Sequence, residues 1–400
     1  MATLFTSWTL ATRAGTGVPG FSGDGGPASQ ASLNEPKGLA IDSQGHLFVA
    51  DSENHLVRRV DRVTGLITTV AGSAPESAPP VSRAGGPDPV YEEEVDPLAE
   101  TSQKTTEQFT QQTDLSGTVR YLVGAAAPKR YGGDDGPATK AVLNFPTAVA
   151  VDAQGHLYIA DTMNHRVRRV DARTGIITTI AGTGQARFSG DGGPADRAAL
   201  NEPAALAIDA QGQLYIADQS NNRVRAVDLK TGIIRTVAGT GSAAYDGDGK
   251  PATESTLAGP SGLAVTAGTL YIADTFNGRI RSVDLSTGMI ATLAGDGGSY
   301  RYQSPHDPPS SSVSRPSGIA LDREGNLFLT DSDSHLIRRW ERATGLLTRI
   351  AGTGSASSAG DGGTALEAGL CYPFGIVSDG ERTLLIADTF NHRIRVLSLE

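Results

Sequence analysis

Short apolar runs separated by polar turns follow one another along most of the chain. The clearest unit lies between residues 147 and 181, where four runs carry β-branched and aromatic side chains: TAVAV, HLYIA, RVRRV and IITTIA. The turns between them carry Gly, Asp and Asn, which accept positive φ or satisfy backbone groups locally. No segment shows a convincing helical period. The pattern predicts a unit of four short antiparallel strands.

The same unit recurs six times. Its best marker is the aspartate that opens DTMNHRVRRV at residue 161, and the other copies open at Asp51, Asp218, Asp274, Asp331 and Asp388. The copies are 56 or 57 residues apart, except for an interval of 110 residues between the first two. A fixed period of this length is typical of repeat architectures.

Six four-stranded units predict an all-β, six-bladed β-propeller. Runs such as YIA at 215–217 are apolar at consecutive positions, which indicates sheets buried on both faces. A radial ring buries both faces of each sheet and leaves only short edges. After Asp388 only a third strand remains, and residues 8–17 resemble the fourth-strand stretch at 176–184. We therefore expect the N-terminal strand to complete the last blade and close one domain spanning residues 1–400.

The repeated pattern PxGLAID, LYIAD, NHRIR and TGIITTVAGTG resembles the NHL-repeat family of six-bladed propellers. The resemblance covers the chain outside one insertion. It implies a propeller fold and, for most members, a platform that binds proteins or RNA. A few related propellers are metal-dependent lyases or lactonases.

Two polar residues of the repeat are present in every copy. Each marker aspartate is followed seven positions later by an arginine, as in Asp161 and Arg168. A catalytic group is needed once in a ring, whereas a residue that holds a blade together is needed in every blade. The recurrence therefore favours a structural role for this pair. We expect the aspartate to cap the turn between strands two and three. The histidine of the motif is replaced by Asn222 and Gly278 in two copies and is not a general requirement.

Function is expected where the repeats differ. The two residues before the proline of each first strand vary, and we expect them to line the mouth of a central channel. The predicted partner-binding residues are Asn34, Glu35, Asn144, Phe145, Asn201, Glu202, Arg315 and Tyr372. The same set resembles by residue class the oxygen shell that holds a metal in lactonase-type propellers. Calcium is a possible ligand here or in the Asp-Gly links such as GDGGPA, although a true calcium loop has a denser ligand pattern.

One insertion interrupts the repeat. Residues 73–116 are rich in Pro, Ser, Thr and Glu and hold nine acidic and two basic residues, a net charge of −7. Such a composition predicts a mobile acidic loop, or a segment that orders on contact with a partner. TVRYLV at 118–123 resembles a second fourth strand for blade one.

Composition narrows the remaining function classes. The formal net charge of −10 disfavours nucleic-acid binding, which depends on Lys and Arg at phosphates. No apolar stretch is long enough to cross a membrane, and the start of the chain lacks a secretory signal, so we expect a cytoplasmic monomer. Nucleophile elbow, phosphate loop and HExxH motifs are absent, and we expect no catalytic residues. The prediction is a non-enzymatic scaffold for a protein or peptide, with a metal-dependent lactonase-like or lyase-like hydrolase as the alternative.

Overall fold

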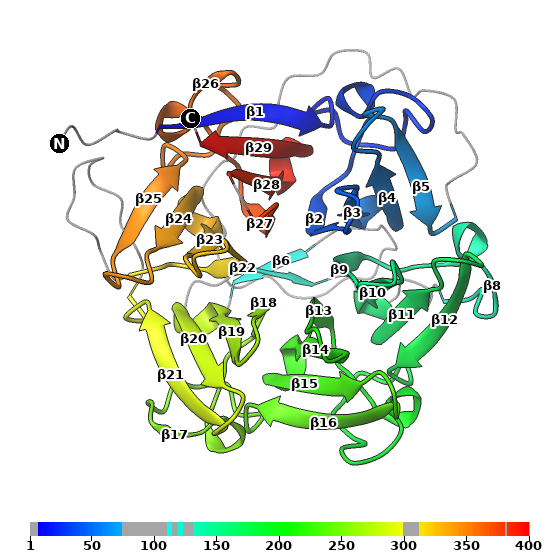
Figure 1. Cartoon of the computed structure of the whole chain (residues 1–400), viewed down its shortest axis with the longest axis vertical. Coiled ribbons are helices and arrows are strands. Elements are labelled where there is room, and N and C mark those ends of the chain that lie inside the picture. The colour runs from blue at the N-terminus through cyan, green and yellow to red at the C-terminus, as the bar shows by residue number, and fades with distance from the viewer. Residues whose placement is uncertain are drawn as a thin grey trace, which may run out of the picture. The chain divides into compact units, whose positions relative to one another are not determined.

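Six antiparallel sheets surround a common axis in the computed structural model (Figure 1), which describes residues 7–73, 110–113, 119–122, 131–298, 312–380 and 382–399. The chain divides into two compact units. The first unit is formed by Met1–Ala74 and Tyr131–Glu400, and the second by Pro75–Arg130. The first unit contains all six sheets, so the predicted six-bladed propeller is confirmed.

Each blade has four strands, ordered from the axis outward. They are, by blade, β2 Pro36–Ile41, β3 Leu47–Asp51, β4 Leu56–Val60 and β5 Ile67–Ala71; β9 Pro146–Val151, β10 Leu157–Asp161, β11 Arg166–Val170 and β12 Ile176–Ala181; β13 Pro203–Ile208, β14 Gln213–Asp218, β15 Arg223–Asp228 and β16 Ile233–Ala238; β18 Gly262–Val265, β19 Thr269–Asp274, β20 Arg279–Asp284 and β21 Met289–Ala294; β22 Pro316–Leu321, β23 Leu327–Asp331, β24 Leu336–Trp340 and β25 Leu347–Ala351; β27 Pro373–Ser378, β28 Thr383–Asp388, β29 Arg393–Leu399 and β1 Trp8–Ala14. Three blades gain a two-residue outer strand, namely β8 Gly136–Pro137, β17 Lys250–Pro251 and β26 Gly363–Thr364.

All helical segments in the described residues are three-residue 3-10 turns. One set lies in the Asp-Gly links between blades: η1 Ala28–Gln30, η3 Ala138–Lys140, η5 Ala195–Arg197, η7 Ala252–Glu254 and η10 Ala365–Glu367. The other set joins strands two and three: η2 Ser52–Asn54, η4 Thr162–Asn164, η6 Gln219–Asn221, η8 Thr275–Asn277, η9 Ser332–Ser334 and η11 Thr389–Asn391. The links are therefore turns followed by one helical turn.

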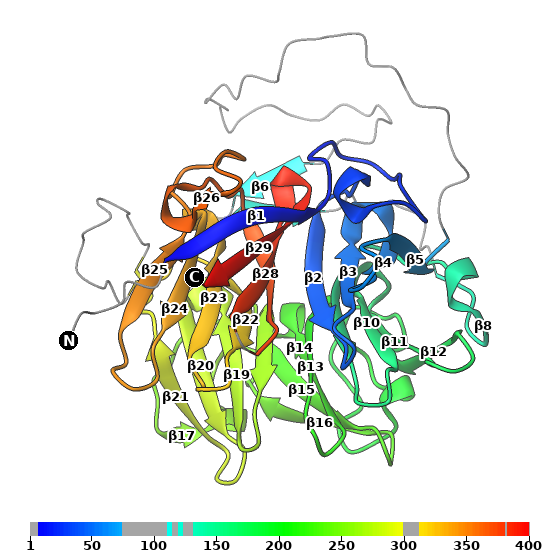
Figure 2. The same ribbon diagram turned by 45° about the horizontal axis from the view of Figure 1, so that its top comes forward.

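The N-terminal strand closes the ring. β1 pairs antiparallel with β29, from Trp8 opposite Leu399 to Ala14 opposite Ile394, and the two strands lie side by side in both views (Figure 2). Leu10 of β1 is fully buried in the cluster between blades five and six. This pairing joins the two ends of the chain in one blade and confirms the predicted closure.

The first strands pack tightly around the axis. Each of β2, β9, β13, β18, β22 and β27 contacts the next one around the ring. Gly375 on β27 makes this approach possible, because a Cβ there would collide with the carbonyl oxygen of Lys37 on β2. Between blades, the aromatic position of strand two is buried, with Tyr158 and Tyr215 each only 2% exposed. Tyr158 packs against blade three and Tyr215 against blade four, so this position contributes to packing between blades.

The second unit contains two short strands. β6 Thr110–Thr113 and β7 Val119–Leu122 pair antiparallel in a sheet of their own. The fourth-strand resemblance of residues 118–123 therefore does not place them in blade one, whose fourth strand is β5. The rest of the predicted insertion, residues 74–109 and 114–116, lies outside the described residues. No helix in the described part of the chain is long and apolar enough to cross a membrane.

Ring closure by β1 predicts that its core side chain is needed for stability. Leu10→Ala removes a fully buried leucine and should lower the free energy of unfolding by about 2–5 kcal/mol. Val18→Ala, at a position 62% exposed, is the matched control and should change it by no more than about 0.5 kcal/mol. Chemical denaturation measures both. Equal, small effects for the two variants would show that β1 does not complete the sixth blade.

Candidate functional site

The marker aspartates fix the residues that precede each first strand. All six lie at the end of strand two and are fully buried. Each Oδ1 accepts a hydrogen bond from the backbone N–H of the first residue of the pair before the proline, at 2.7 to 3.0 Å. The donor and acceptor residues are Asn34 and Asp51, Asn144 and Asp161, Asn201 and Asp218, Ala258 and Asp274, Ser314 and Asp331, and Cys371 and Asp388. The predicted capping of the following turn backbone is wrong, because no side-chain cap bond is made there.

The second carboxylate oxygen receives the arginine of strand three. In blade two, Arg168 donates from Nη1 to Asp161 Oδ2 at 3.2 Å and from Nη2 to Asp134 of the Asp-Gly link at 2.6 Å. Asn164 also donates to the Asp161 carboxylate. Burial raises the pKa of Asp161 to about 6, while these donated hydrogen bonds and Arg168 lower it. The pair is thus structural, as its recurrence predicts.

The motif histidine links one blade to the next. Nδ1 of His55 accepts a hydrogen bond from the backbone N–H of Phe145 at 2.9 Å, and Asn222 Oδ1 accepts one from Gly259 at 2.9 Å. The other histidine pairs are His165 with Glu202, His335 with Tyr372 and His392 with Glu35. Five of the six junctions therefore carry this bond. At the remaining junction Gly278 stands in the histidine position, and Arg315 N–H bonds Asp331 instead.

These bonds hold the residue before each proline in an unusual backbone conformation. Four non-glycine residues are left-handed there: Glu35, Phe145, Glu202 and Tyr372, with φ from 47° to 53°. The fifth is Gly259 with φ of 55°. Left-handed backbone is strained for large side chains and persists only when the surrounding contacts impose it. The backbone of the predicted site residues is therefore held in the same way in these blades, while their side chains vary from blade to blade.

Two further variable positions lie beside this pair, and sequence analysis missed both. One follows the proline, where Lys37 and Phe374 replace the small residues of the other blades. The other is two residues after the marker aspartate, where the N–H of Glu53, Phe276 and Phe390 bonds the carbonyl of the first residue of the pair. The signal was available, since both positions vary between repeats whose neighbours do not.

Large and charged side chains at these positions form what we call the axial arc. It runs from blade four through blades five, six and one to blade two and consists of Phe276, Arg315, Asp333, Tyr372, Phe374, Phe390, Glu35, Lys37, Glu53, Phe145 and Met163. Blade three contributes the smaller Ala204 and Ser220, with Glu202 hydrogen-bonded to Ser220 at 2.5 Å. The structure thus distributes the predicted residues unevenly around the axis.

Lys37 is the centre of one half of the arc. Its Nζ lies 4.8 Å from the ring centroid of Phe145 and 4.6 Å from that of Phe374, so rings from the two neighbouring blades flank it. The nearest carboxylate oxygen, Glu35 Oε2, is 4.0 Å away. Burial lowers the pKa of the Lys37 ammonium group and raises the pKa of the Glu35 carboxyl group.

Arg315 is the centre of the other half. Its guanidinium group lies 5.3 Å from the ring centroid of Phe276, and Nη1 is 3.8 Å from Asp333 Oδ1. Tyr372 packs edge to face against His335 and Phe390, with centroids 4.6 and 5.2 Å apart. Burial raises the pKa of Asp333. Arg315 is also close enough to lower the pKa of Lys37, which connects the two halves.

The arc does not fit a calcium ion, because two cationic side chains lie among its oxygen donors. In five links an aspartate is already bound to a buried arginine, at 2.5 to 2.9 Å, and these aspartates are Asp24, Asp134, Asp191, Asp248 and Asp361. Within the described residues, no group of three or more His, Cys, Asp or Glu side chains could hold a metal ion. We derive no metal chemistry at either place.

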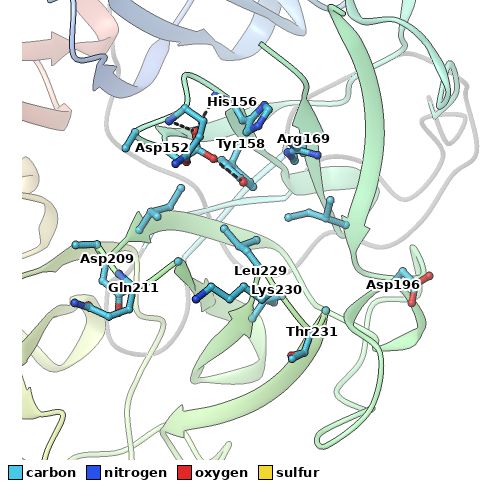
Figure 3. Close-up of a pocket in the computed structure, with 18 of the residues that line it drawn as sticks. Asp152, His156, Tyr158, Arg169, Asp196, Asp209, Gln211, Leu229, Lys230 and Thr231 are labelled. Atoms are coloured by element: carbon cyan, nitrogen blue, oxygen red, sulfur yellow. Dashed lines mark hydrogen bonds between the residues drawn. The ribbon is translucent and has the colours of Figure 1, made fainter. Parts of the chain in front are cut away.

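A separate pocket of about 880 Å³ lies between blades two and three (Figure 3). It is lined by the strand-one to strand-two turns near Asp152 and Asp209 and by Lys230 and Thr231 of a strand-three to strand-four turn. Tyr158 donates a hydrogen bond to Asp152 Oδ2 at 3.0 Å. None of the predicted site residues lines this pocket, which lies at the opposite ends of the strands.

Comparisons with known proteins agree with this architecture. A family profile described as NHL repeat matches residues 143–170, and one described as Teneurin NHL domain matches residues 17–85 and 183–245. Suppressor of quenching 1, chloroplastic, from Arabidopsis thaliana is 30% identical over 279 residues, which cover 66% of this chain and 26% of that protein. NHL repeat-containing protein 2 from Bos taurus is 27% identical over 323 residues, covering 71% of this chain and 43% of that protein. The chain thus spans less than half the length of these relatives.

Solved structures show the same fold. A protein of unknown function from Bacteroides thetaiotaomicron has a TM-score of 0.63 at 18% identity, over 99% of this chain and 76% of that one. A gluconolactonase from Xanthomonas campestris has a TM-score of 0.51 at 15% identity, over 92% of this chain and 87% of that one. Fold and repeats together define a six-bladed β-propeller. It is an NHL-repeat protein, and the resemblance in its sequence is confirmed.

The histidine bonds predict an acid-sensitive ring. Burial lowers the pKa of His335 and His392 in the fold, and a protonated Nδ1 could not accept the N–H of Tyr372 or Glu35. The stability they contribute is present above the unfolded pKa of about 6.5 and is lost as the pH falls through the lower folded pKa. His335→Asn with His392→Asn, which copies the natural Asn222, should reduce the fall in melting temperature between pH 7 and pH 5.

The reciprocal variant is the control. Asn222→His should increase the fall in melting temperature over the same pH range, because it adds a titrating acceptor to a junction that lacks one. Histidine already occupies the same left-handed position in four other blades, so the fold should be kept. Identical pH profiles for wild type and both variants would show that the histidines do not carry this bond in solution.

Proposed function

We propose that this NHL-repeat propeller is a scaffold that binds a protein or peptide at the axial arc. The observation that carries the proposal is the contrast between fixed backbone and varied side chains. Bonds from the marker aspartates and the histidines hold the same backbone in blade after blade, yet the side chains range from Glu35 to Phe145 to Tyr372. A rigid scaffold with varied loop side chains is typical of a recognition surface.

The composition of the arc supports the same conclusion. Aromatic and arginine side chains most often dominate the energy of protein recognition, and the arc contains Phe145, Arg315 and Tyr372. Phe276 is 40% exposed, which leaves an aromatic face accessible to a partner. Because blade three contributes only small side chains and Glu202, the surface is one-sided, which suits a partner without six-fold symmetry.

The test is a triple variant of the arc, Phe145→Ala with Arg315→Ala and Tyr372→Ala. Loss of one such side chain costs about 2 kcal/mol or more, and the contributions are not additive, so the triple variant should bind an identified partner at least about 30-fold more weakly. Proteins captured from a lysate by the wild type are identified first, and their affinity for the purified variants is then measured by calorimetry. Melting curves check that the variant is folded.

The control changes the other pocket. Gln154→Ala with Gln211→Ala and Lys230→Ala removes three of the residues that line it and should leave the affinity unchanged. Loss of binding in this variant but not in the arc variant would show that the partner binds at the pocket between blades two and three, and would overturn the proposal.

A further inference from the structure

Lys37 and Arg315, the two cations of the axial arc, have no hydrogen-bonded carboxylate among the described residues. The buried arginines of the blades take the link aspartates at 2.5 to 2.9 Å, whereas Lys37 and Arg315 have their nearest carboxylate oxygens at 4.0 and 3.8 Å. These longer separations exceed hydrogen-bond distance. Among the residues that the structure describes, neither side chain donates a hydrogen bond. An ammonium group has three donors and a guanidinium group five, so both cations keep open donors.

The cations are also deeper than the carboxylates around them. The side chains of Lys37 and Arg315 are 12% and 18% exposed, while those of Glu35 and Asp333 are 25% and 44% exposed. A group that enters the arc therefore meets positive charge at its base and negative charge at its rim. Because the effective dielectric constant falls with depth, the charge at the base has the larger effect on an entering ligand.

From this geometry we propose that Lys37 and Arg315 together bind the carboxylate group of a peptide ligand. The inference rests on the proposed function and names the chemistry of its ligand. Two cations from blades one and five can share the two oxygens of one carboxylate, which would supply the acceptors that both side chains lack. Lys37 lies on β2 and Arg315 directly before β22, and both strands contact β27, so the two cations lie on either side of blade six, where one ligand can reach both.

The surroundings favour a carboxylate that is attached to an apolar side chain. Phe145 and Phe374 flank Lys37, and Phe276 lies beside Arg315. These rings offer apolar surface next to the charged base. Of the formal −10 of the chain, −7 belongs to residues 73–116, but the arc itself holds Glu35, Glu53 and Asp333 beside its two cations. Burial raises the pKa of all three carboxyl groups, which lowers the cost of neutralising them when an anion binds. The carboxylate can be the end of a peptide or an acidic side chain within it.

Small probes separate these two sources. N-acetylphenylalanine carries a terminal carboxylate beside a ring, N-acetylglutamic acid α-amide carries only a side-chain carboxylate, and N-acetylphenylalaninamide carries neither. Binding to the full chain is measured by calorimetry or by ligand-observed NMR. We expect at least one acid to bind about tenfold or more tightly than the amide. Binding of only one acid identifies the source and supports the proposal.

Variants assign the site. Lys37→Gln and Arg315→Gln should each weaken binding of that acid by about tenfold, and the exposed Lys140→Gln and Arg173→Gln are matched controls that should change it by less than about twofold. The proposal is overturned if neither acid binds more tightly than the amide, or if Lys37→Gln and Arg315→Gln behave like their controls. If partner binding still depends on the arc while no acid binds, the carboxylate inference fails and the proposed function stands.

Discussion

Each blade is held together by a buried carboxylate that accepts hydrogen bonds from the N–H just before the first strand and from an arginine of the third strand. Burying a charge is costly unless it is paired and hydrogen-bonded, and removing one member of such a pair costs about 3–5 kcal/mol. Here the carboxylate is that of Asp161 and its equivalents, and the arginine side chains are among the largest fully buried ones in the described chain. The same arginine reaches the link from the preceding blade. One group thus fixes the first strand, the third strand and the link at once.

Bonds between blades are less uniform than bonds within them. At most junctions a histidine accepts an N–H and a hydroxyl, such as that of Ser52 or Thr162, donates to the carbonyl of the next proline. Within the described chain, Gln219 replaces the hydroxyl between blades three and four, and Gly278 replaces the histidine between blades four and five. Of these two kinds of bond, blade four thus has one at each of its two junctions, whereas the other junctions of the described chain have both. The axial arc begins in this blade with Phe276.

The propeller, its closure and the structural role of the aspartate–arginine pair could be predicted from the sequence because each repeats at a fixed spacing. The acceptor role of Asp51 could not, since its donor Asn34 lies before the first strand of the blade, 17 residues away, and is identified only when the blade is folded. Lys37 was missed for a related reason. It contacts Phe374 from the opposite end of the chain, and the two meet only once β1 has closed the ring and β27 lies against β2.

The division between fixed and free positions explains how one ring can support recognition without losing stability. The strained residues before the prolines are held by hydrogen bonds from their own backbone N–H groups to histidine side chains. Blade two has Phe145 where blade one has Glu35, and the same bond is made in both. Side chains on a backbone that is already ordered lose less entropy when a partner binds. The loose ion pairs of Lys37 and Arg315 follow from the same division. The fold takes its aspartates and arginines into tight internal pairs, whereas Lys37 and Arg315 lie outside that network, with their nearest carboxylate oxygens at 4.0 and 3.8 Å, and can bind a carboxylate of a ligand.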